Sequence, residues 1–264
     1  MSKKHNKVVQ KQFSKTADAF SRFASRDTDD VLSERVEFAK PQPGELALDV
    51  ACGPGTLVLE LATRLGLARG IDLTHDMLLR ALALRAERQI RNACFEEGEA
   101  ERLPYPDAAF DLVTCQFAFH HMLKPAAALK EMVRVLKPEG RILIADTLGP
   151  ESDEKWELHN RIETVRDPSH VASLRLTSFL ALFEKMELFP ARQTSKPRPR
   201  SFSRWMLRAG LEPSHSRYQE TRSLIEEAIP GDRAAFATQR EGDDLIIFHH
   251  EGMFLLRKAV DGRT

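Results

Sequence analysis

The stretch that decides the fold reads LDVACGPGT and runs from Leu48 to Thr56. An apolar run, Leu46 to Val50, leads into a turn with glycines at 53 and 55, and a helical pattern follows as far as Leu65. Glycine removes the side chain where a backbone must approach a ligand, and the first N–H groups of a helix lack partners within it. The segment predicts a strand, a ligand-binding turn and a helix N-terminus, unless the glycines serve the turn alone.

The glycine spacing separates two kinds of site. A dinucleotide-binding G-x-G-x-x-G motif would need a third glycine where this chain has Val58, so a dehydrogenase is the least favoured hypothesis. A second strand ends at Gly70-Ile71-Asp72-Leu73. A carboxylate at the tip of the strand beside such a turn is placed to hold a ribose diol.

Strand and helix patterns alternate around this segment as far as Thr147. A helical stretch, Phe13–Lys40, precedes it, and we expect the lysine-rich residues 1–12 to form a flexible tail. Alternating strands and helices indicate βαβ units and a parallel sheet with helices on both faces. The other strands are expected at Ala68–Leu73, Phe95–Gly98, Phe110–Phe117 and Arg141–Thr147, and the helices at Met77–Gln89 and around Leu129–Leu136.

The alternation breaks after Gly149. No flexible linker separates the later segments, so we expect a single domain over residues 13–264. These segments are helices at Glu151–Arg166, Thr177–Met186 and Arg222–Ile229, a basic stretch at Ala191–Arg204 and a closing strand at Gly252–Lys258.

The composition is that of a soluble globular protein. The formal net charge is zero and hydrophobic residues make up 42%, so the chain can bury a sizeable core and carries no overall attraction for polyanions. Its three cysteines show no C-x-x-C spacing, which argues against disulfides and against a metal site. There is no apolar signal region and no apolar run of about 18 residues that could span a membrane. We therefore expect a cytoplasmic monomer or homodimer.

These ordered segments resemble the class I S-adenosylmethionine-dependent methyltransferases, especially the small-molecule branch with the ubiquinone/menaquinone C-methyltransferases. The resemblance covers Phe13–Thr147 well and the last third of the chain loosely. Ala51 replaces the usual first glycine, as in the quinone branch, and Glu99 stands where aspartate is commoner. The resemblance implies a Rossmann-like methyltransferase fold, with a mostly parallel seven-stranded sheet and helices on both faces. Residues 41–148 would form the cofactor-binding half, and residues 149–250 a helical lid with insertions.

The resemblance also implies a cofactor site for S-adenosylmethionine, which leaves as S-adenosylhomocysteine. The glycine turn would face the methionine end, Asp72 the ribose and Met77 the adenine, although Met77 could equally be plain core. Glu99 would read the adenine edge or remain a solvated charge. The implied cofactor-binding residues are Asp49, Ala51, Cys52, Gly53, Gly55, Asp72, Leu73, Met77, Glu99, Ala100, Gln116 and Phe117.

Two histidines after the fourth strand are the candidate catalytic residues. Methyl transfer is an in-line displacement in which the cofactor supplies the reactivity, so a base is needed only for a protonated acceptor. His120 and His121 follow the strand that would end beside the sulfonium, and histidine has a suitable pKa. We favour His121 because it matches a frequent family histidine, although the family's nearby aspartate is Lys124 here. Either histidine could instead cap a helix or fill core.

The sequence predicts methyl transfer to a small organic acceptor. The segment Cys115–Phe119 lacks the Asn-Pro-Pro-aromatic signature of amino-group methylation, so O- or C-methylation is favoured. One alternative is an RNA or protein methyltransferase, with Arg192–Arg208 touching phosphate, but a basic run is more often a solvated face. Another is a non-catalytic cofactor-binding scaffold protein. Glu151–His170 would form a lid or packing helix, and its candidate acceptor contacts are Trp156, His159, Arg161 and His170.

Overall fold

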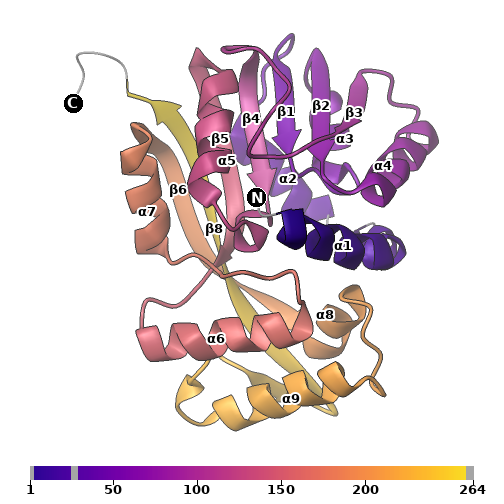
Figure 1. Ribbon diagram of the computed structural model, residues 1–264, viewed down its shortest axis with the longest axis vertical. Coiled ribbons are helices and arrows are strands. Elements are labelled where there is room, and N and C mark those ends of the chain that lie inside the picture. Colours follow the sequence, from indigo (N-terminus) through magenta and orange to yellow (C-terminus); the bar gives the residue numbers. More distant parts are fainter. Residues whose placement is uncertain (1–2, 25–28, 260–264) are drawn as a thin grey trace.

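The computed structural model of the protein describes residues 3–24 and 29–259, which form one mixed sheet flanked by helices (Figure 1). The sheet is eight-stranded in the order β3-β2-β1-β4-β5-β8-β6, and β7 pairs with β8. The pairs among β1 to β5 are parallel, whereas β8 runs antiparallel to β5, β6 and β7. The strands are β1 Leu46–Val50, β2 Leu67–Asp72, β3 Ala93–Glu97, β4 Phe110–Gln116, β5 Leu136–Leu148, β6 Leu188–Ser201, β7 Gln239–Glu241 and β8 Asp244–Lys258.

The helices cover both faces of this sheet, and a separate apolar core lies on each face. Leu112 belongs to one core and Val113 to the other, because successive strand residues point to opposite faces. The central strands are buried on both faces and therefore read as continuous apolar runs. The helices are α1 Lys3–Ala24, α2 Asp29–Ala39, α3 Thr56–Ala62, α4 His75–Glu87, α5 Pro125–Val135, α6 Asp153–Arg166, α7 Leu176–Lys185, α8 Phe202–Arg208 and α9 Ser216–Ala228, with short 3-10 turns η1 Phe119–His121 and η2 Pro230–Asp232.

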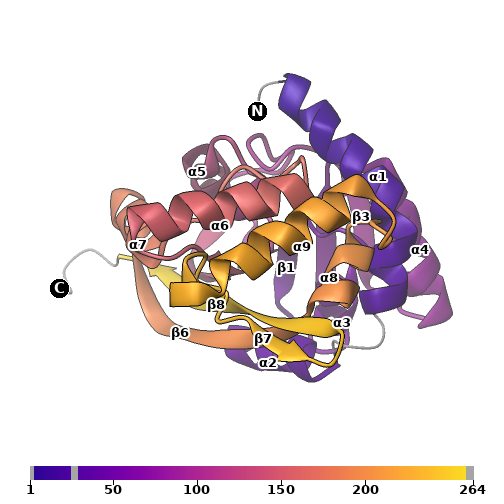
Figure 2. The same ribbon diagram turned by 90° about the horizontal axis from the view of Figure 1, so that it is seen from below.

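The strands β6 and β8 run past the rest of the sheet and carry a second lobe. The helices α6, α8 and α9 pack around the far ends of these strands, with α6 and α9 side by side (Figures 1 and 2). We call α6, α8, α9 and β7, with residues 196–201 and 244–251, the helical lobe. It has a core of its own, built around Ile162, Phe202, Trp205 and Phe236. The lobe projects from the sheet on the side to which the parallel strands point their carboxyl ends (Figure 1).

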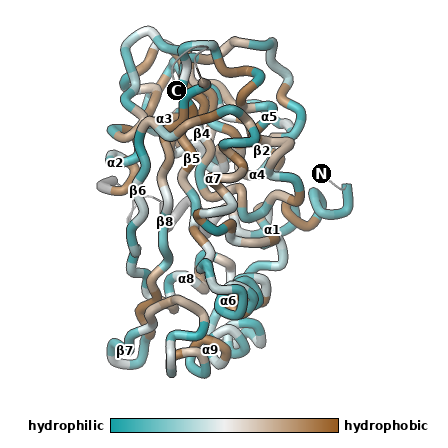
Figure 3. Tube along the Cα trace, turned by 90° about the vertical axis from the view of Figure 1, so that its left-hand side faces the viewer, coloured by the Kyte–Doolittle hydropathy of each residue, from teal (hydrophilic) through white to brown (hydrophobic). Residues whose placement is uncertain are grey.

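The predicted fold class is confirmed, but the strand β6 was missed. The basic stretch Ala191–Arg204 had no element assigned, and it supplies most of this strand and the start of α8. Half-buried Lys196, Arg198 and Arg200 alternate with exposed residues, so the buried face carries charge and the strand lacks the usual apolar signal. The prolines of β6 are tolerated because an edge strand can leave one side of its backbone unpaired. Figure 3 shows teal and white along β6, and brown along β4 and β5.

The N-terminal helix begins earlier than the sequence indicated. The predicted flexible tail at residues 1–12 is wrong over residues 3–12, which form the first half of α1. Asn6, Val9 and Gln12 are buried at helical spacing, while the lysines lie between them and face outward. Contacts with α4 and α8 hold the helix against the body of the protein. The helical pattern that we expected through Lys40 is divided into α1 and α2, and residues 25–28 lie outside the described part of the chain.

Candidate active site

The carboxyl ends of the parallel strands open into a cavity of about 290 Å³ that reaches across to α1 and the helical lobe. Eleven of the predicted site residues line it: Ala51, Cys52, Gly53, Asp72, Leu73, Met77, Ala100, Gln116, Phe117, His120 and His121. Asp49, Gly55 and Glu99 are not on its wall. The sheet register brings these distant segments together, because Asp49 of β1 pairs with Gly70 of β2 and Thr114 of β4.

The two glycines of the turn, Gly53 and Gly55, have different structural roles. Gly53 adopts a positive φ of 53°, and an added Cβ would meet nothing within 4 Å. Gly55 has a φ of 76°, but its Cβ would lie 2.6 Å from Cε1 of Phe95. Gly53 therefore keeps the cavity open, whereas Gly55 permits close packing behind it. Ala51, at the position of the family's first glycine, still adopts a left-handed φ of 57°.

Asp72 ties the glycine turn to the start of α4. Its Oδ2 accepts a hydrogen bond from the Gly53 N–H at 2.8 Å, and its Oδ1 accepts one from the Thr74 N–H at 2.8 Å. Burial raises the pKa of this carboxyl, and the backbone hydrogen bonds oppose the rise. The carboxylate also interacts with the Thr74 side chain and the Leu73 backbone, and Asp72 lines the cavity. Asp72 therefore both shapes the turn and offers acceptors to the cavity.

Asp49 and Glu99 stand apart from the other predicted residues. Asp49 is buried, its Oδ1 accepts a hydrogen bond from Thr114 Oγ1 at 2.6 Å, and its Oδ2 has no partner among the described residues. Burial raises the pKa of Asp49 to about 7, since the hydrogen bond from Thr114 offsets it only in part. Glu99 is exposed and forms a backbone bridge with Arg102. The predicted contact of Glu99 with the adenine edge is not supported by this placement.

His120 forms the closest polar pair in the cavity. Its Nδ1 lies 2.5 Å from Oδ1 of Asp146, a buried aspartate at the end of the apolar run of β5. The other oxygen of Asp146 accepts a hydrogen bond from the Phe119 N–H at 2.8 Å, so the carboxylate is held in place. Burial lowers the pKa of His120, but the Asp146 carboxylate outweighs it and the pKa is raised above the ordinary 6.5. Asp146 was not predicted as a site residue, although an acid within the otherwise apolar end of the predicted strand Arg141–Thr147 was the available signal.

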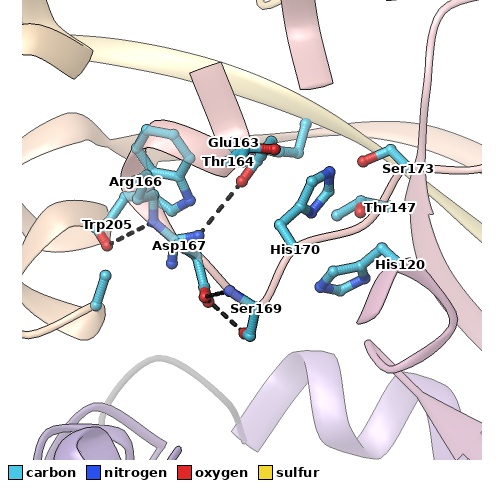
Figure 4. A network of polar contacts seen from close by, with 12 residues as sticks. His120, Thr147, Glu163, Thr164, Arg166, Asp167, Ser169, His170, Ser173 and Trp205 are labelled. Atoms are coloured by element: carbon cyan, nitrogen blue, oxygen red, sulfur yellow. Dashed lines mark hydrogen bonds and ion pairs between the residues drawn. The ribbon is translucent and has the colours of Figure 1, made fainter. Parts of the chain in front are cut away.

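His121 lies in a different environment from its neighbour. Its Nδ1 is 3.0 Å from the Ser169 carbonyl oxygen and 3.2 Å from Ser169 Oγ, and its ring meets Phe13 edge-on. Burial, followed by the charge of His120, lowers its pKa to about 4. Figure 4 shows the loop after α6 that carries Ser169, and His170 of that loop beside His120. His121 therefore fastens the loop, whereas His120 has an acidic partner of its own.

The wall opposite the glycine turn is built from charged side chains. Arg35 of α2 donates to Glu251 Oε1 at 2.9 Å and to Gln116 Oε1 at 3.0 Å, and lies 4.5 Å from the centre of the Phe117 ring. In the helical lobe, Glu163 Oε1 lies 2.8 Å from His249 Nε2. Arg166 lies 4.4 Å from the centre of the Trp205 ring (Figure 4). The sequence did not indicate that these residues line the cavity: Arg35, Glu163, Arg166, Asp167, Arg200, Trp205, Arg208 and His249.

Three of the four residues that were expected to contact the acceptor have partners away from the cavity. Trp156 donates to the Ser173 carbonyl at 2.9 Å, and His159 stacks on Phe236 with ring centres 4.4 Å apart. His170 lies 2.8 Å from the side-chain oxygen of Asn160, and Arg161 is exposed. None of the four predicted contacts lines the cavity.

Comparison with known proteins places this arrangement in a family. Residues 48–144 match the family described as "Methyltransferase domain". The chain is 32% identical over 179 residues to an uncharacterized methyltransferase, YcgJ, of Bacillus subtilis, covering 68% of this chain and 71% of that protein. The crystal structure of YcgJ superposes with a TM-score of 0.78 at 26% identity, over 87% of this chain and 98% of YcgJ.

The chain belongs to the methyltransferase family. It is an S-adenosylmethionine-dependent methyltransferase. A crystal structure of a putative methyltransferase from Bacillus halodurans agrees, with a TM-score of 0.80 at 26% identity over 87% of this chain and 99% of that one. A demethylmenaquinone methyltransferase of Deinococcus radiodurans is 42% identical over 107 residues, which is 40% of this chain and 44% of that protein. The family match ends at residue 144, before the helical lobe begins, so it carries no information about the acceptor side.

The cavity of this methyltransferase fits the cofactor on two observations. The open space at Gly53 would admit a ligand against the backbone, and the partnerless Oδ2 of Asp49 is a buried acceptor beneath the turn. Within residues 3–24 and 29–259, no cluster of side chains could hold a metal ion. None of the helices described has the length and apolar character needed to cross a bilayer.

Proposed function

We propose that this methyltransferase transfers a methyl group to an oxygen or carbon atom of a small-molecule acceptor, with His120 taking the acceptor's proton. One observation carries the proposal. A single cavity runs from Gly53 and Asp72 at the cofactor end to the His120–Asp146 pair and on to the helical lobe. A donor and an acceptor bound in it would lie end to end, as an in-line displacement requires.

The residues at the sheet end would hold S-adenosylmethionine, whose sulfonium supplies an activated methyl group. The carboxylate of Asp72 would accept hydrogen bonds from the ribose hydroxyls, as expected from its position at the tip of β2. The backbone around Gly53 would contact the methionine end, and buried Asp49 would favour its ammonium group. Met77 and Ala100 would pack on the adenine, and Gln116 and Phe117 would lie near the sulfur.

His120 is placed to act as a general base through its second nitrogen. When Nδ1–H donates to Asp146, the neutral ring keeps Nε2 as a proton acceptor, the arrangement in which a carboxylate orients a catalytic histidine. The side chain lines the cavity and is 15% exposed, so Nε2 can be reached by an acceptor bound there. We therefore assign the base to His120 rather than to His121, whose lowered pKa makes it a weak proton acceptor.

Several cations of the basic stretch have partners within the protein. Lys196 and Arg198 both pair with Glu34, and Arg192 stacks over the Phe38 ring with 4.4 Å to its centre. These cations are therefore engaged within the protein rather than presented to phosphates. A cavity of about 290 Å³ is also of the size that takes a small molecule. Both observations favour a small-molecule acceptor over RNA.

The test follows the fate of a labelled methyl group. The protein is incubated with methyl-labelled S-adenosylmethionine and either a small-molecule extract or total RNA with protein. We expect the label in the small-molecule fraction, and its transfer should be lost in His120→Ala. Label confined to RNA or protein would overturn the proposal for the acceptor. Failure of the folded protein to bind S-adenosylhomocysteine in a calorimetric titration would overturn the cofactor assignment.

A further inference from the structure

More cationic than anionic side chains line the lobe end of the cavity. Four arginines line it, at positions 35, 166, 200 and 208. Arg35 is neutralised by Glu251, whose second oxygen lies 3.6 Å from Arg198. Glu163 is engaged by His249 at 2.8 Å and by Arg166 at 3.3 Å. The two glutamates nearest to this wall are thus already committed to other partners, and the third acid, Asp167, accepts hydrogen bonds from Ser169.

Arg200 differs from Arg35 and Arg166, which are paired with glutamates. It enters the cavity from the far end of β6, and its guanidinium has no hydrogen bond or ion pair to any residue in the described part of the chain. Its Nε is fully buried and unpartnered. Burial, followed by the charge of Arg208, lowers the pKa of Arg200 to about 10, so the side chain stays cationic at neutral pH. A guanidinium whose Nε is buried without a partner is costly, and its fork of donors matches an oxyanion.

The position of Arg200 relates it to the acceptor rather than to the cofactor. The guanidinium carbon lies 5.8 Å from the centre of the ring of Phe117, the residue that directly follows β4. Trp205 and Arg208 of α8 line the same part of the cavity. A molecule with its nucleophile at His120 would extend toward this group.

We infer that the acceptor carries an oxyanion, a carboxylate or a phosphate monoester, which binds Arg200 at the lobe end of the cavity. The inference rests on the proposed function and adds the chemical class of the acceptor. An uncharged quinone would leave Arg200 with only the charge of Glu251, which is already shared with Arg35 and Arg198. The oxyanion would form paired charge-assisted hydrogen bonds with the guanidinium and hold the acceptor in one orientation.

The test compares matched probes on protein loaded with S-adenosylhomocysteine. Calorimetry measures 3,4-dihydroxybenzoate against catechol, and phenyl phosphate against phenol. We expect one of the two anions to bind about tenfold tighter than its neutral partner, as hydrogen bonds to a charged group allow. The anion that shows this preference identifies the carboxylate or the phosphate. Equal binding of both pairs, with S-adenosylhomocysteine still bound, overturns the inference and leaves the proposed function standing.

Substitutions of two arginines in β6 test whether the anion preference depends on Arg200. Arg200→Gln should remove the anion preference, and Arg200→Lys should keep part of it, because it retains the charge but not the planar fork. Arg192→Gln is the matched control, since Arg192 lies on the same strand but is exposed and outside the cavity. Circular dichroism checks folding, and S-adenosylhomocysteine affinity should be unchanged in all three. An anion preference that survives in folded Arg200→Gln also overturns the inference. Loss of cofactor binding in the wild-type protein would instead be a failure of the proposed function.

Discussion

The two ends of the cavity are lined by different chemical groups. At the sheet end, the wall combines backbone groups, the Asp72 carboxylate and a few uncharged side chains, and most of its residues lie at or just after the ends of β1 to β4. At the lobe end, the wall consists of charged and aromatic side chains from α2, α6, α8, β6 and β8. The pair Arg35 and Glu251 joins positions 216 residues apart in the chain.

This difference has a physical cause. A backbone site needs a particular turn, and a turn needs glycines at fixed neighbouring positions, so the requirement is concentrated in a short segment. A site made of side-chain pairs needs only that two charges meet in space, and many pairs of positions can provide that. The cofactor end is therefore expected to vary little among such proteins, while the acceptor end can be rebuilt by single substitutions.

His120 lies where the two ends meet, and its removal should have the largest effect on activity. We expect His120→Ala to lower turnover about 10²- to 10⁴-fold, the usual contribution of a general base, with S-adenosylhomocysteine affinity unchanged. His121→Ala is the control and should instead loosen the loop at Ser169, lowering the melting temperature more than the rate. A larger loss of rate in His121→Ala would reverse the assignment.

The pH profile tests the His120–Asp146 pair in a separate way. A base works in its neutral form, so kcat/KM should rise with pH through a pKa above the ordinary 6.5, because Asp146 raises it. In Asp146→Asn the carboxylate is gone, so the acid limb should move to lower pH while the plateau falls. An acid limb at the same pH in both proteins would show that His120 does not control it.

The glycine turn should give the next largest effect, on binding rather than on rate. Gly53→Val should reduce S-adenosylhomocysteine affinity by more than about a hundredfold with the fold retained, since its side chain would enter open cavity. In contrast, Gly55→Ala should lower the melting temperature, because its Cβ would collide with Phe95. Calorimetry and thermal denaturation of both variants separate the two roles. Unfolding of Gly53→Val would indicate that both glycines are structural.

The sequence was sufficient for the first half of the molecule because its signals are local. The strands up to Thr147 could be predicted from short patterns, and most residues that the family resemblance implies for the cofactor line the cavity. The choice between adjacent His120 and His121 could not, because it depends on Asp146 of a different strand. Nor could β6, whose inward face carries Lys196, Arg198 and Arg200 in place of apolar residues. Lys196 and Arg198 pair with Glu34, which is distant in the sequence. From sequence alone, a charged residue on an inward face looks the same as one on a solvent-exposed face until its partner is known.

Asp72 should show a moderate effect on the cofactor alone. We expect Asp72→Ala to weaken S-adenosylhomocysteine binding by about 1–3 kcal/mol, as hydrogen bonds to a charged group are lost. Part of this loss comes from the turn, because Asp72 also holds the Gly53 N–H. Glu99→Ala is the control, since Glu99 is exposed and off the cavity wall, and its affinity should not change. Equal losses of affinity in both variants would show that Glu99 also contributes to cofactor binding.

The smallest effect concerns the motion of the elements that cover the cavity. The helical lobe has its own core and joins the sheet mainly through β6 and β8, so it can move as a body, while α7 packs Phe179 and Phe183 into the core of the sheet. The helix α1 touches the site through Gln10, which donates to the Leu73 carbonyl at 3.0 Å, and through His5 at the His121 carbonyl. Opening of α1 or α6 should release bound ligand, so ligand should suppress it. We therefore expect hydrogen exchange in α1 and α6 to slow by up to about a hundredfold when S-adenosylhomocysteine is present at a hundred times its Kd. Exchange in β4 and α7 should change little, because their opening is governed by the core of the sheet. If α1 and α6 already exchange as slowly as β4 without ligand, they are rigid packing elements, and entry to the cavity must follow another route.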